Sequence, residues 1–460
     1  MQPILAARKG MYDESLSESS SINRKPDGIS PEGNPEWTKI KEQAIEDWLR
    51  HFGFHFNPFQ ATDAERDEHL ATYFVEHPDF DNLARLENRL IFARAGDGKT
   101  VLRLRLQSFY REELLRKKVF CFSYTIPLTV AANPPSDIAS HLPHILKASV
   151  RHAFVLLATH GNDLANLQSD PAIASAFAAY FDRYLGTSFW LDDLRDALAT
   201  NSVDPIIQNL KSTFDDLDLP SGWLTLNSLW LRHWLELLPD VTDRSLLAAD
   251  DITQWPDLLP NATDRLPVAG DDTAQWQVWQ TWQELLRRAG FRASLLLIDG
   301  IDVKPSAKEA SGVQASPDLM QRMAMPLVRE MQENWFGEHT FVKLFLPIEI
   351  FILLSDTLHV NDPIAILHWS REELGQLLAT RLQAATYGAI TDFSQLVEPD
   401  VHPQFTEWLL TVAGFSPRYL LHAIDLILRV HVGQSNPGKA AGKISCSTLA
   451  KFPFAYPQPY

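Results

Sequence analysis

The chain of 460 residues is poor in cysteine and in basic residues, and it lacks a long uninterrupted hydrophobic run. Two cysteines cannot form an all-cysteine zinc site or a disulfide framework. The chain has 41 Lys and Arg against 58 acidic residues, and its net charge of −17 argues against bulk attraction to nucleic acid or anionic lipid. The net charge does not exclude a local basic groove. The most apolar run, 341–355, is interrupted by Lys343 and Pro347 and is too short to span a bilayer. We therefore expect a cytoplasmic protein without a membrane partner.

What is present is a hydrophobic fraction of 45%, enough for an extensive core in a chain of roughly two to four domains. RLIFA (89–93), a glycine-containing loop, a helical stretch and VFCFSYTI (119–126) follow one another, which predicts a βαβ unit. Further buried strands are expected at 292–303 and 341–347. Between residues 160 and 290 the pattern is helical, with 20 acidic against 8 basic residues, so that most of the negative charge lies there.

The segment ARAGDGKT (93–100) follows a predicted strand and opens a predicted helix. Glycines at 96 and 98 let backbone N–H groups approach phosphate oxygens, and the start of the helix adds its positive end. Lys99 can bridge the β- and γ-phosphates, and the Thr100 hydroxyl can ligate Mg²⁺. The first position of the motif is Ala93 instead of glycine, a mild departure. The alternative is an ordinary tight turn before a helix, and the Gly-Lys-Thr sequence favours the phosphate interpretation.

A second acidic position supports this interpretation. LLLIDG ends a buried hydrophobic run with Asp299, and an acid there is either a turn former or a ligand of the Mg²⁺ shell beside Thr100. Paired with an upstream phosphate loop, the metal interpretation is favoured. Two histidines, His141 and His144, have a spacing that could place them on one helix face, but no acidic or cysteine ligand accompanies them. We therefore expect a solvated or capping role for the two histidines.

These motifs together resemble P-loop NTPases of the AAA+ and STAND type. ARAGDGKT resembles Walker A, and LLLIDGID resembles the Walker B form of NACHT-like STAND proteins. ILHWSREELGQLLATRL (366–382) is similar to the segment that begins the helical lid of initiator-type AAA+ proteins. AGFSPRYLL (413–421) resembles their sensor-2 segment, and FNPFQATDAERDEHLATYF (56–74) resembles the lead-in to the first core strand.

The resemblance implies ATP and Mg²⁺ as cofactors. Arg418 would be the sensor-2 residue that reaches the γ-phosphate from the lid. Gly300 stands where many AAA+ enzymes have a water-polarising Glu, and Asp302 occupies the next acidic position of the NACHT-like form, so Asp302 is the candidate base. No residue is assigned to the sensor-1 position of these ATPases. The predicted cofactor-binding residues are Ala95, Gly96, Asp97, Gly98, Lys99, Thr100 and Val101, with Thr100 and Asp299 at the metal.

The fold that follows is an α/β, three-layer P-loop NTPase core with a long acidic all-helical insert and a C-terminal helical lid. The predicted boundaries are a disordered tail at 1–36, core at 37–130 and 291–360, insert at 131–290, lid at 361–432 and a tail at 433–460. The function implied is an ATPase acting as a nucleotide-dependent switch or assembly ATPase, with slow hydrolysis.

Partners and alternatives also follow from the resemblance. A homo-oligomer is expected, or a partner protein bound through the insert. A neighbouring copy could supply an arginine finger, with Arg381 and Arg329 as candidates. A nucleotide-binding scaffold with little turnover and an initiator-like DNA-associated ATPase are the alternatives, and the acidic balance disfavours the latter.

Overall fold

The computed structural model describes residues 35–60, 67, 69–126, 138, 140–160, 170–185, 272–301, 316–333, 336–359, 362–399, 401, 405–434 and 442–449. These residues divide into two compact units. One, here the sheet unit, contains residues 84–92 and 102–365. The other, here the helical unit, contains the chain up to Leu83, the segment 93–101 and everything from Ile366. The protein is thus of the α/β class, and each unit has its own architecture.

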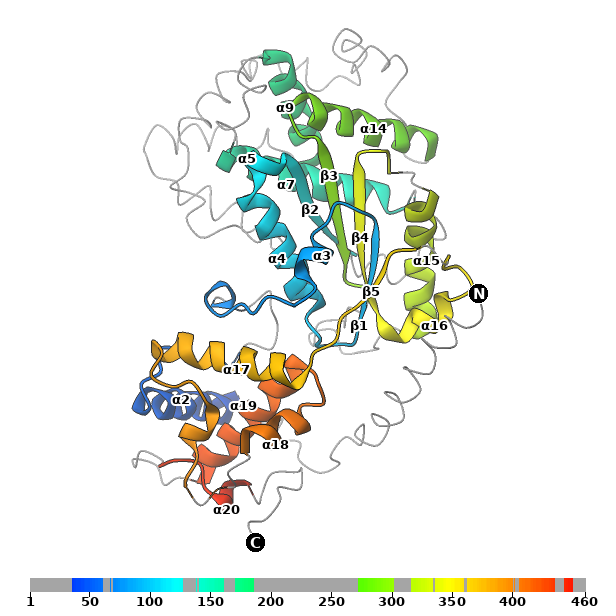
Figure 1. Cartoon of the computed structure of the whole chain (residues 1–460). Helices are drawn as coiled ribbons and strands as arrows, with labels where there is room; N and C mark the ends of the chain where they lie inside the picture. The colour runs from blue at the N-terminus through cyan, green and yellow to red at the C-terminus, as the bar shows by residue number, and fades with distance from the viewer. Residues whose placement is uncertain are drawn as a thin grey trace, which may run out of the picture. The chain divides into compact units, whose positions relative to one another are not determined.

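A parallel sheet of five strands is built from β1 (Arg89–Ala93), β2 (Val119–Thr125), β3 (Ala293–Asp299), β4 (Thr340–Pro347) and β5 (Ile364–Ile366) (Figure 1). Its spatial order is β2-β3-β4-β1-β5. The central strands are buried on both faces, which is why they read as continuous hydrophobic runs and not as alternating ones. The four strands predicted from sequence are confirmed. β5 was not predicted, because three residues carry too little pattern.

Helices cover both faces of this sheet (Figure 1). On β2, the Ser123 hydroxyl bonds to Gln107 of α4 (Lys99–Glu112). On β3, the Ser294 hydroxyl bonds to Gln283 of α14 (Asp272–Arg288). Ser123 is level with Leu297, three residues from Ser294, and side chains an odd number apart lie on opposite faces. α4 and α14 therefore cover opposite faces.

The remaining helices of the sheet unit include three that fall in or beside the predicted insert. α7 (Leu142–His160) packs on β2, and α9 (Pro171–Leu185) and α14 pack against α7. The part of the predicted insert that is described thus packs with the sheet, while residues 186–271 lie outside the described residues. The other elements are α3 (Phe80–Leu83, helical unit), α5 (Leu114–Lys117), α15 (Pro317–Glu333), η7 (Ile348–Ile350) and α16 (Phe351–Leu354).

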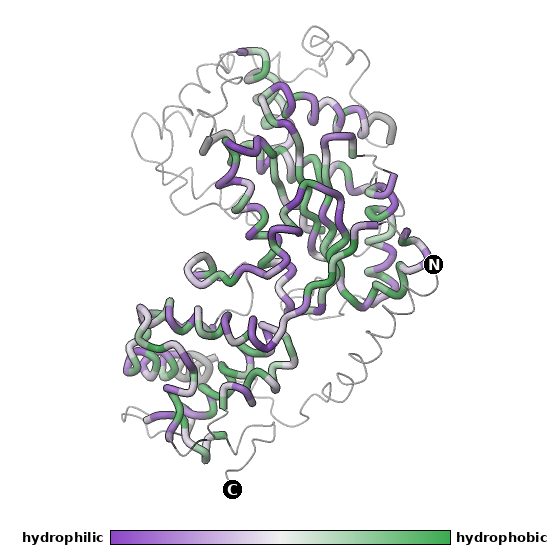
Figure 2. Tube along the Cα trace, in the orientation of Figure 1, coloured by the Kyte–Doolittle hydropathy of each residue, from purple (hydrophilic) through white to green (hydrophobic). Residues whose placement is uncertain are grey.

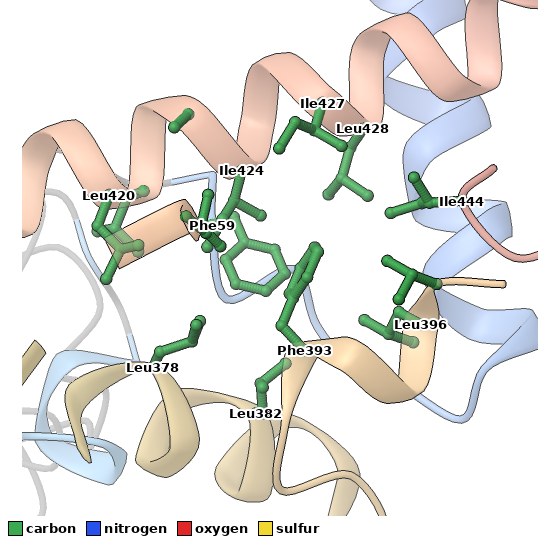
Figure 3. Packing of buried hydrophobic residues seen from close by; sticks show 14 of the residues in the cluster. Phe59, Leu378, Leu382, Phe393, Leu396, Leu420, Ile424, Ile427, Leu428 and Ile444 are labelled. Atoms are coloured by element: carbon green, nitrogen blue, oxygen red, sulfur yellow. The ribbon is translucent and has the colours of Figure 1, made fainter. Parts of the chain in front are cut away.

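The helical unit packs α2 (Pro35–His51), α17 (Arg371–Thr386), α18 (Phe405–Val412), α19 (Pro417–Gln434) and α20 (Cys446–Leu449) around one core, with short turns η2 (Leu70–Thr72) and η8 (Phe393–Leu396). Figure 3 shows the rings of Phe59 and Phe393 at its centre, with centroids 5.8 Å apart, and aliphatic side chains of α17 and α19 closing in on them. Figure 2 shows hydrophobic stretches on these helices alternating with hydrophilic ones, as expected for amphipathic helices around a core.

Three details of local structure go beyond what the sequence patterns predict. Residues 405–434, mostly within the predicted helical lid, form two helices, because Gly414 and Phe415 both have positive φ and end α18. The described residues between 64 and 75 contain only the short helical turn η2. The segment from 433 contributes Ile444 and Leu449 to the core, both at most 1% exposed. Residues 1–34 lie outside the described residues.

Among the helices of the described residues, none combines the length and apolar character that crossing a bilayer requires.

Candidate functional site

The phosphate-loop motif forms a tight turn between the end of β1 and the start of α4. Gly96 and Gly98 have φ of 95° and 92°, a region in which residues with a side chain are strained, so the two glycines are required by the turn. The Asp97 N–H donates to the Arg94 carbonyl at 3.2 Å and closes it. Lys99 is the first residue of α4, so the loop ends at the positive pole of a helix of 14 residues. This geometry suits an anion.

Lys99 is held at the base of the loop. Its Nζ donates to the carbonyls of Ala93 at 3.2 Å and Arg94 at 3.3 Å, and the residue is only 6% exposed. A hydrogen bond from an ammonium group to an ionised phosphate oxygen is stronger than one to a backbone carbonyl. A triphosphate at the loop fits this arrangement, and it would bring the lysine its strongest electrostatic partner.

Asp97 shapes the loop and does not face a ligand with its side chain. Its Oδ2 accepts from the Arg94 N–H at 3.2 Å, and its backbone carbonyl accepts from the Trp369 indole Nε1 at 2.9 Å. The carboxyl is 5% exposed, and burial raises its pKa, a shift that the neighbouring Arg94 backbone, Lys99 and the Ser416 hydroxyl oppose. Oδ1 has no partner in hydrogen-bonding geometry. The Asp97 side chain therefore holds the backbone of the loop in place.

The start of α19 contacts the same loop from within the helical unit. The Arg418 N–H donates to the Gly96 carbonyl at 3.4 Å. A Cβ placed on Gly96 would lie 2.7 Å from Arg418 Cβ and 3.0 Å from Ser416 Oγ, closer than real Cβ atoms come, so glycine alone fits. The Arg418 side chain is exposed. The structure thus brings Arg418, predicted from the lid motif, against the phosphate loop.

Asp299 ends β3 in the sheet unit and is 5% exposed. Its Oδ1 accepts from the Gly300 N–H at 2.8 Å, and its Oδ2 accepts from Arg103 Nε at 3.3 Å. Arg103 is not singled out in the sequence analysis, where it falls within the helical stretch expected after the glycine-containing loop. Its spacing was a usable signal, because Arg103 follows Lys99 by four residues and so lies on the same face of α4.

Thr100 and Asp299 offer a hydroxyl and a carboxylate, the hard oxygen donors that Mg²⁺ prefers. No cluster of three or more His, Cys, Asp or Glu with metal-binding geometry occurs among the described residues. Mg²⁺ usually keeps several waters and phosphate oxygens, so it needs few donors from a protein. Among the other predicted residues, Ala95 is exposed, Val101 is half-buried in the first turn of α4, and Asp302 lies outside the described residues.

The two candidate arginine-finger residues, Arg381 and Arg329, differ in burial. Arg381 is buried and committed within its own chain, donating to the Pro58 carbonyl at 2.6 Å and to Asp67 at 3.2 Å. Its guanidinium also lies 4.1 Å from the centre of the Tyr73 ring. Arg329 is exposed on α15. Arg381 is therefore a structural residue, and of the two only Arg329 is accessible.

The two histidines, His141 and His144, differ in burial. His141 is 0% exposed, and its Nδ1 shares a hydrogen bond of 3.0 Å with the Tyr124 hydroxyl. His144 is exposed, and its pKa is lowered by partial burial and by Lys147. They do not form a common metal site. Of the solvated or capping role expected for both, the solvated alternative is wrong for His141, which is buried directly before the start of α7.

Comparison of the chain with protein-family models, with curated proteins and with solved structures finds no match.

Proposed function

We propose that the chain binds ATP with Mg²⁺ at residues 93–101 and uses the nucleotide state to control assembly or a partner protein. The phosphate loop would hold the triphosphate through the backbone of Ala95–Val101 and through Lys99. Thr100 and Asp299 would hold Mg²⁺, whose chemistry is to neutralise the phosphate charge that develops during transfer to water. Asp302 would position that water, and Arg418 would report the γ-phosphate to the lid.

One observation carries this proposal most directly. A loop with two left-handed glycines follows a strand of a parallel sheet and ends at a buried lysine that opens a helix. A second strand of the same sheet, β3, ends in Asp299. In open α/β sheets the carboxyl ends of parallel strands share one edge, where ligands bind.

The finer architecture belongs to the same proposal. The sheet with helices on both faces would be the three-layer core of a P-loop NTPase, and the helices after β5 would be its lid. The acidic residues between 160 and 290 would bind a partner protein or a second copy of the chain. Their strong net negative charge favours a basic partner surface, and this remains a prediction for the part outside the described residues.

The second part of the proposal is that ATP hydrolysis is slow. The alternative function that differs least from this is a nucleotide-binding scaffold with little turnover. Gly300 leaves the position after Asp299 without a carboxylate, and Arg103 already occupies one oxygen of Asp299. Both features favour a switch over a motor. DNA-associated activity has less support, because the net charge of −17 opposes phosphate-backbone binding.

The test is a pair of assays on the full chain with Mg²⁺: binding of a fluorescent ATP analogue and phosphate release at several protein concentrations. We expect Lys99→Ala to weaken binding by about a hundredfold or more, because a buried charge-assisted contact to phosphate is lost. We expect Asp302→Ala to bind normally and to lose turnover.

Three results discriminate the alternatives. Turnover that rises per chain with concentration points to a site completed between copies. Binding without turnover in the wild type leaves the scaffold. Binding that Lys99→Ala leaves unchanged would refute the site, and the exposed Lys147→Ala serves as the matched control for loss of one positive charge.

A further inference from the structure

In the sheet unit, the proposed metal ligand Asp299 forms a buried ion pair with Arg103. Their side chains are 6% and 7% exposed, and Arg103 Nε lies 3.3 Å from Asp299 Oδ2. Asp299 is level with Thr125, two residues beyond Ser123, so it projects on the face that α4 covers. Arg103 reaches it from the second turn of that helix, one turn after Lys99 and Thr100.

Arg103 is embedded in the unit and is not a surface residue that swings freely. Burial lowers the pKa of His152 and raises the pKa of Cys121; the positive charge of Arg103 has a smaller effect, which adds to the shift of His152 and opposes that of Cys121. The guanidinium is therefore close enough to α7 and β2 for its charge to act there, and it lies beside β3 through Asp299. A cation in this place does electrostatically what a metal ion at Asp299 would do, since it neutralises a buried carboxylate.

A divalent ion and a guanidinium compete for one carboxylate. Mg²⁺ bound at Asp299 takes the oxygen lone pairs that Arg103 uses, and it places two further positive charges beside a buried positive charge. With the pair intact, the metal must either displace Arg103 or bind against its repulsion. The pair therefore lowers the affinity of the carboxylate for Mg²⁺ and leaves nucleotide binding itself at the phosphate loop.

We propose that Arg103 is an internal cation that competes with Mg²⁺ for Asp299, so that the metal enters only by exchange with the arginine. The inference rests on the proposed function, because it concerns the metal of that site. Arg103 is a positioning residue: it acts on the metal ligand and touches neither phosphate nor water. Nucleotide can then bind while Arg103 still holds Asp299, and only the entry of Mg²⁺ completes the site.

The experiment measures how strongly Mg²⁺ and nucleotide help each other to bind. A fluorescent ATP analogue is titrated onto the full chain in EDTA and in a series of Mg²⁺ concentrations, and the ratio of the two affinities is compared between variants. Arg103→Gln removes the charge but keeps a hydrogen-bond donor for Asp299. We expect its ratio to exceed that of the wild type by about tenfold or more. Arg103→Lys keeps the charge and is expected to behave like the wild type.

A second readout is made on the wild type, and the conservative variant Arg103→Lys serves only to assign the signal. The Nε–H of Arg103 gives an arginine signal that is assigned by its absence in Arg103→Lys. We expect the signal to be protected from exchange with water in the nucleotide-free wild type and to lose protection when Mg²⁺ and the nucleotide are added together, but not with nucleotide in EDTA.

The outcomes separate this inference from the function it rests on. An unchanged or reduced ratio in folded Arg103→Gln overturns the inference, and so does an Nε–H that stays protected with Mg²⁺ and nucleotide. Absence of nucleotide binding by the wild type in EDTA and Mg²⁺ alike overturns the proposed function instead. A larger ratio in Arg103→Gln that Arg103→Lys does not share supports the exchange.

Discussion

Lys343 lies in the middle of β4 and has no exposed surface. Its Nζ donates to two backbone carbonyls, those of Arg85 at 2.9 Å and Glu87 at 3.4 Å. Burial, followed by the charge of Arg89, lowers its pKa from 10.5 to about 7. A neutral amine still has two N–H groups, so both carbonyls stay satisfied when the proton leaves. This residue makes stability depend on pH.

The dependence has a defined sign. In the unfolded chain the lysine keeps its proton up to 10.5, whereas in the folded chain it loses it near pH 7. The unfolded state thus binds more protons between these values, and the free energy of unfolding rises with pH there, by up to roughly 1.4 kcal/mol per pH unit. Below pH 7 the penalty of burying the charge is fully present.

We predict that Lys343→Met removes most of this slope between pH 7 and 9. The upper limit is set by Cys121, whose ordinary pKa of 9.0 is raised to about 12 by burial and which adds an opposite slope above pH 9. Denaturant unfolding of both proteins across this window gives the slopes. Lys147→Met, at an exposed lysine of α7, should keep the slope of the wild type. Equal slopes for Lys343→Met and the wild type would contradict the prediction.

At the scale of elements, the phosphate loop depends on a tryptophan that is distant in sequence. The Trp369 Nε1 donates to the Asp97 carbonyl at 2.9 Å, which fixes the peptide between Asp97 and Gly98 and so the direction of the Gly98 N–H. Trp48 makes a bond of the same kind and length to the Gly442 carbonyl, in the same unit but away from the loop. The two tryptophans form a matched pair, since both are buried.

We predict that Trp369→Phe weakens binding of an ATP analogue by about three- to tenfold, because the loop loses the hydrogen bond that orients it. Trp48→Phe should cost a similar amount of stability, about 1 kcal/mol, and leave the affinity unchanged. Nucleotide titration and thermal unfolding of the two variants separate the effects. Equal losses of affinity in both would mean that the unit as a whole, and not this contact, supports the loop.

At the scale of the whole molecule, residues 93–101 form part of the helical unit, although the residues on both sides of them belong to the sheet unit. The loop is flanked in sequence by β1 and α4, yet Gly96 and Asp97 also contact the start of α19 and Trp369. A ligand on the loop should therefore be felt by the helical unit, since hydrogen bonds between them transmit its order.

We predict that an ATP analogue slows amide hydrogen exchange in the loop, around Trp369 and at residues 416–420, by about tenfold or more at saturation. α20, which packs in the same unit without contacting the loop, is the internal reference and should not change. Exchange read by mass spectrometry of the full chain resolves these segments. Slowing confined to residues 93–101 would show that the loop is not coupled to the helices through these contacts.

Much of this architecture could be read from residues that are close in sequence. The strands of the sheet are buried on both faces and so appear as hydrophobic runs, and the Gly-Lys-Thr sequence after RLIFA predicts a turn before a helix. Even the break between α18 and α19 had a signal, because Gly414 and Pro417 are the residues that end one helix and begin the next.

The sequence by itself therefore determined the strands, the tight turn after β1 and the helices around them, because these features follow from local periodicity and from backbone freedom at Gly96 and Gly98. Only the tertiary structure decided which side chains meet. It placed Trp369 on Asp97, Arg418 on Gly96 and Arg103 on Asp299, and these contacts join residues that are 196 to 322 positions apart. Such pairings depend on how distant segments pack, and no local pattern encodes them.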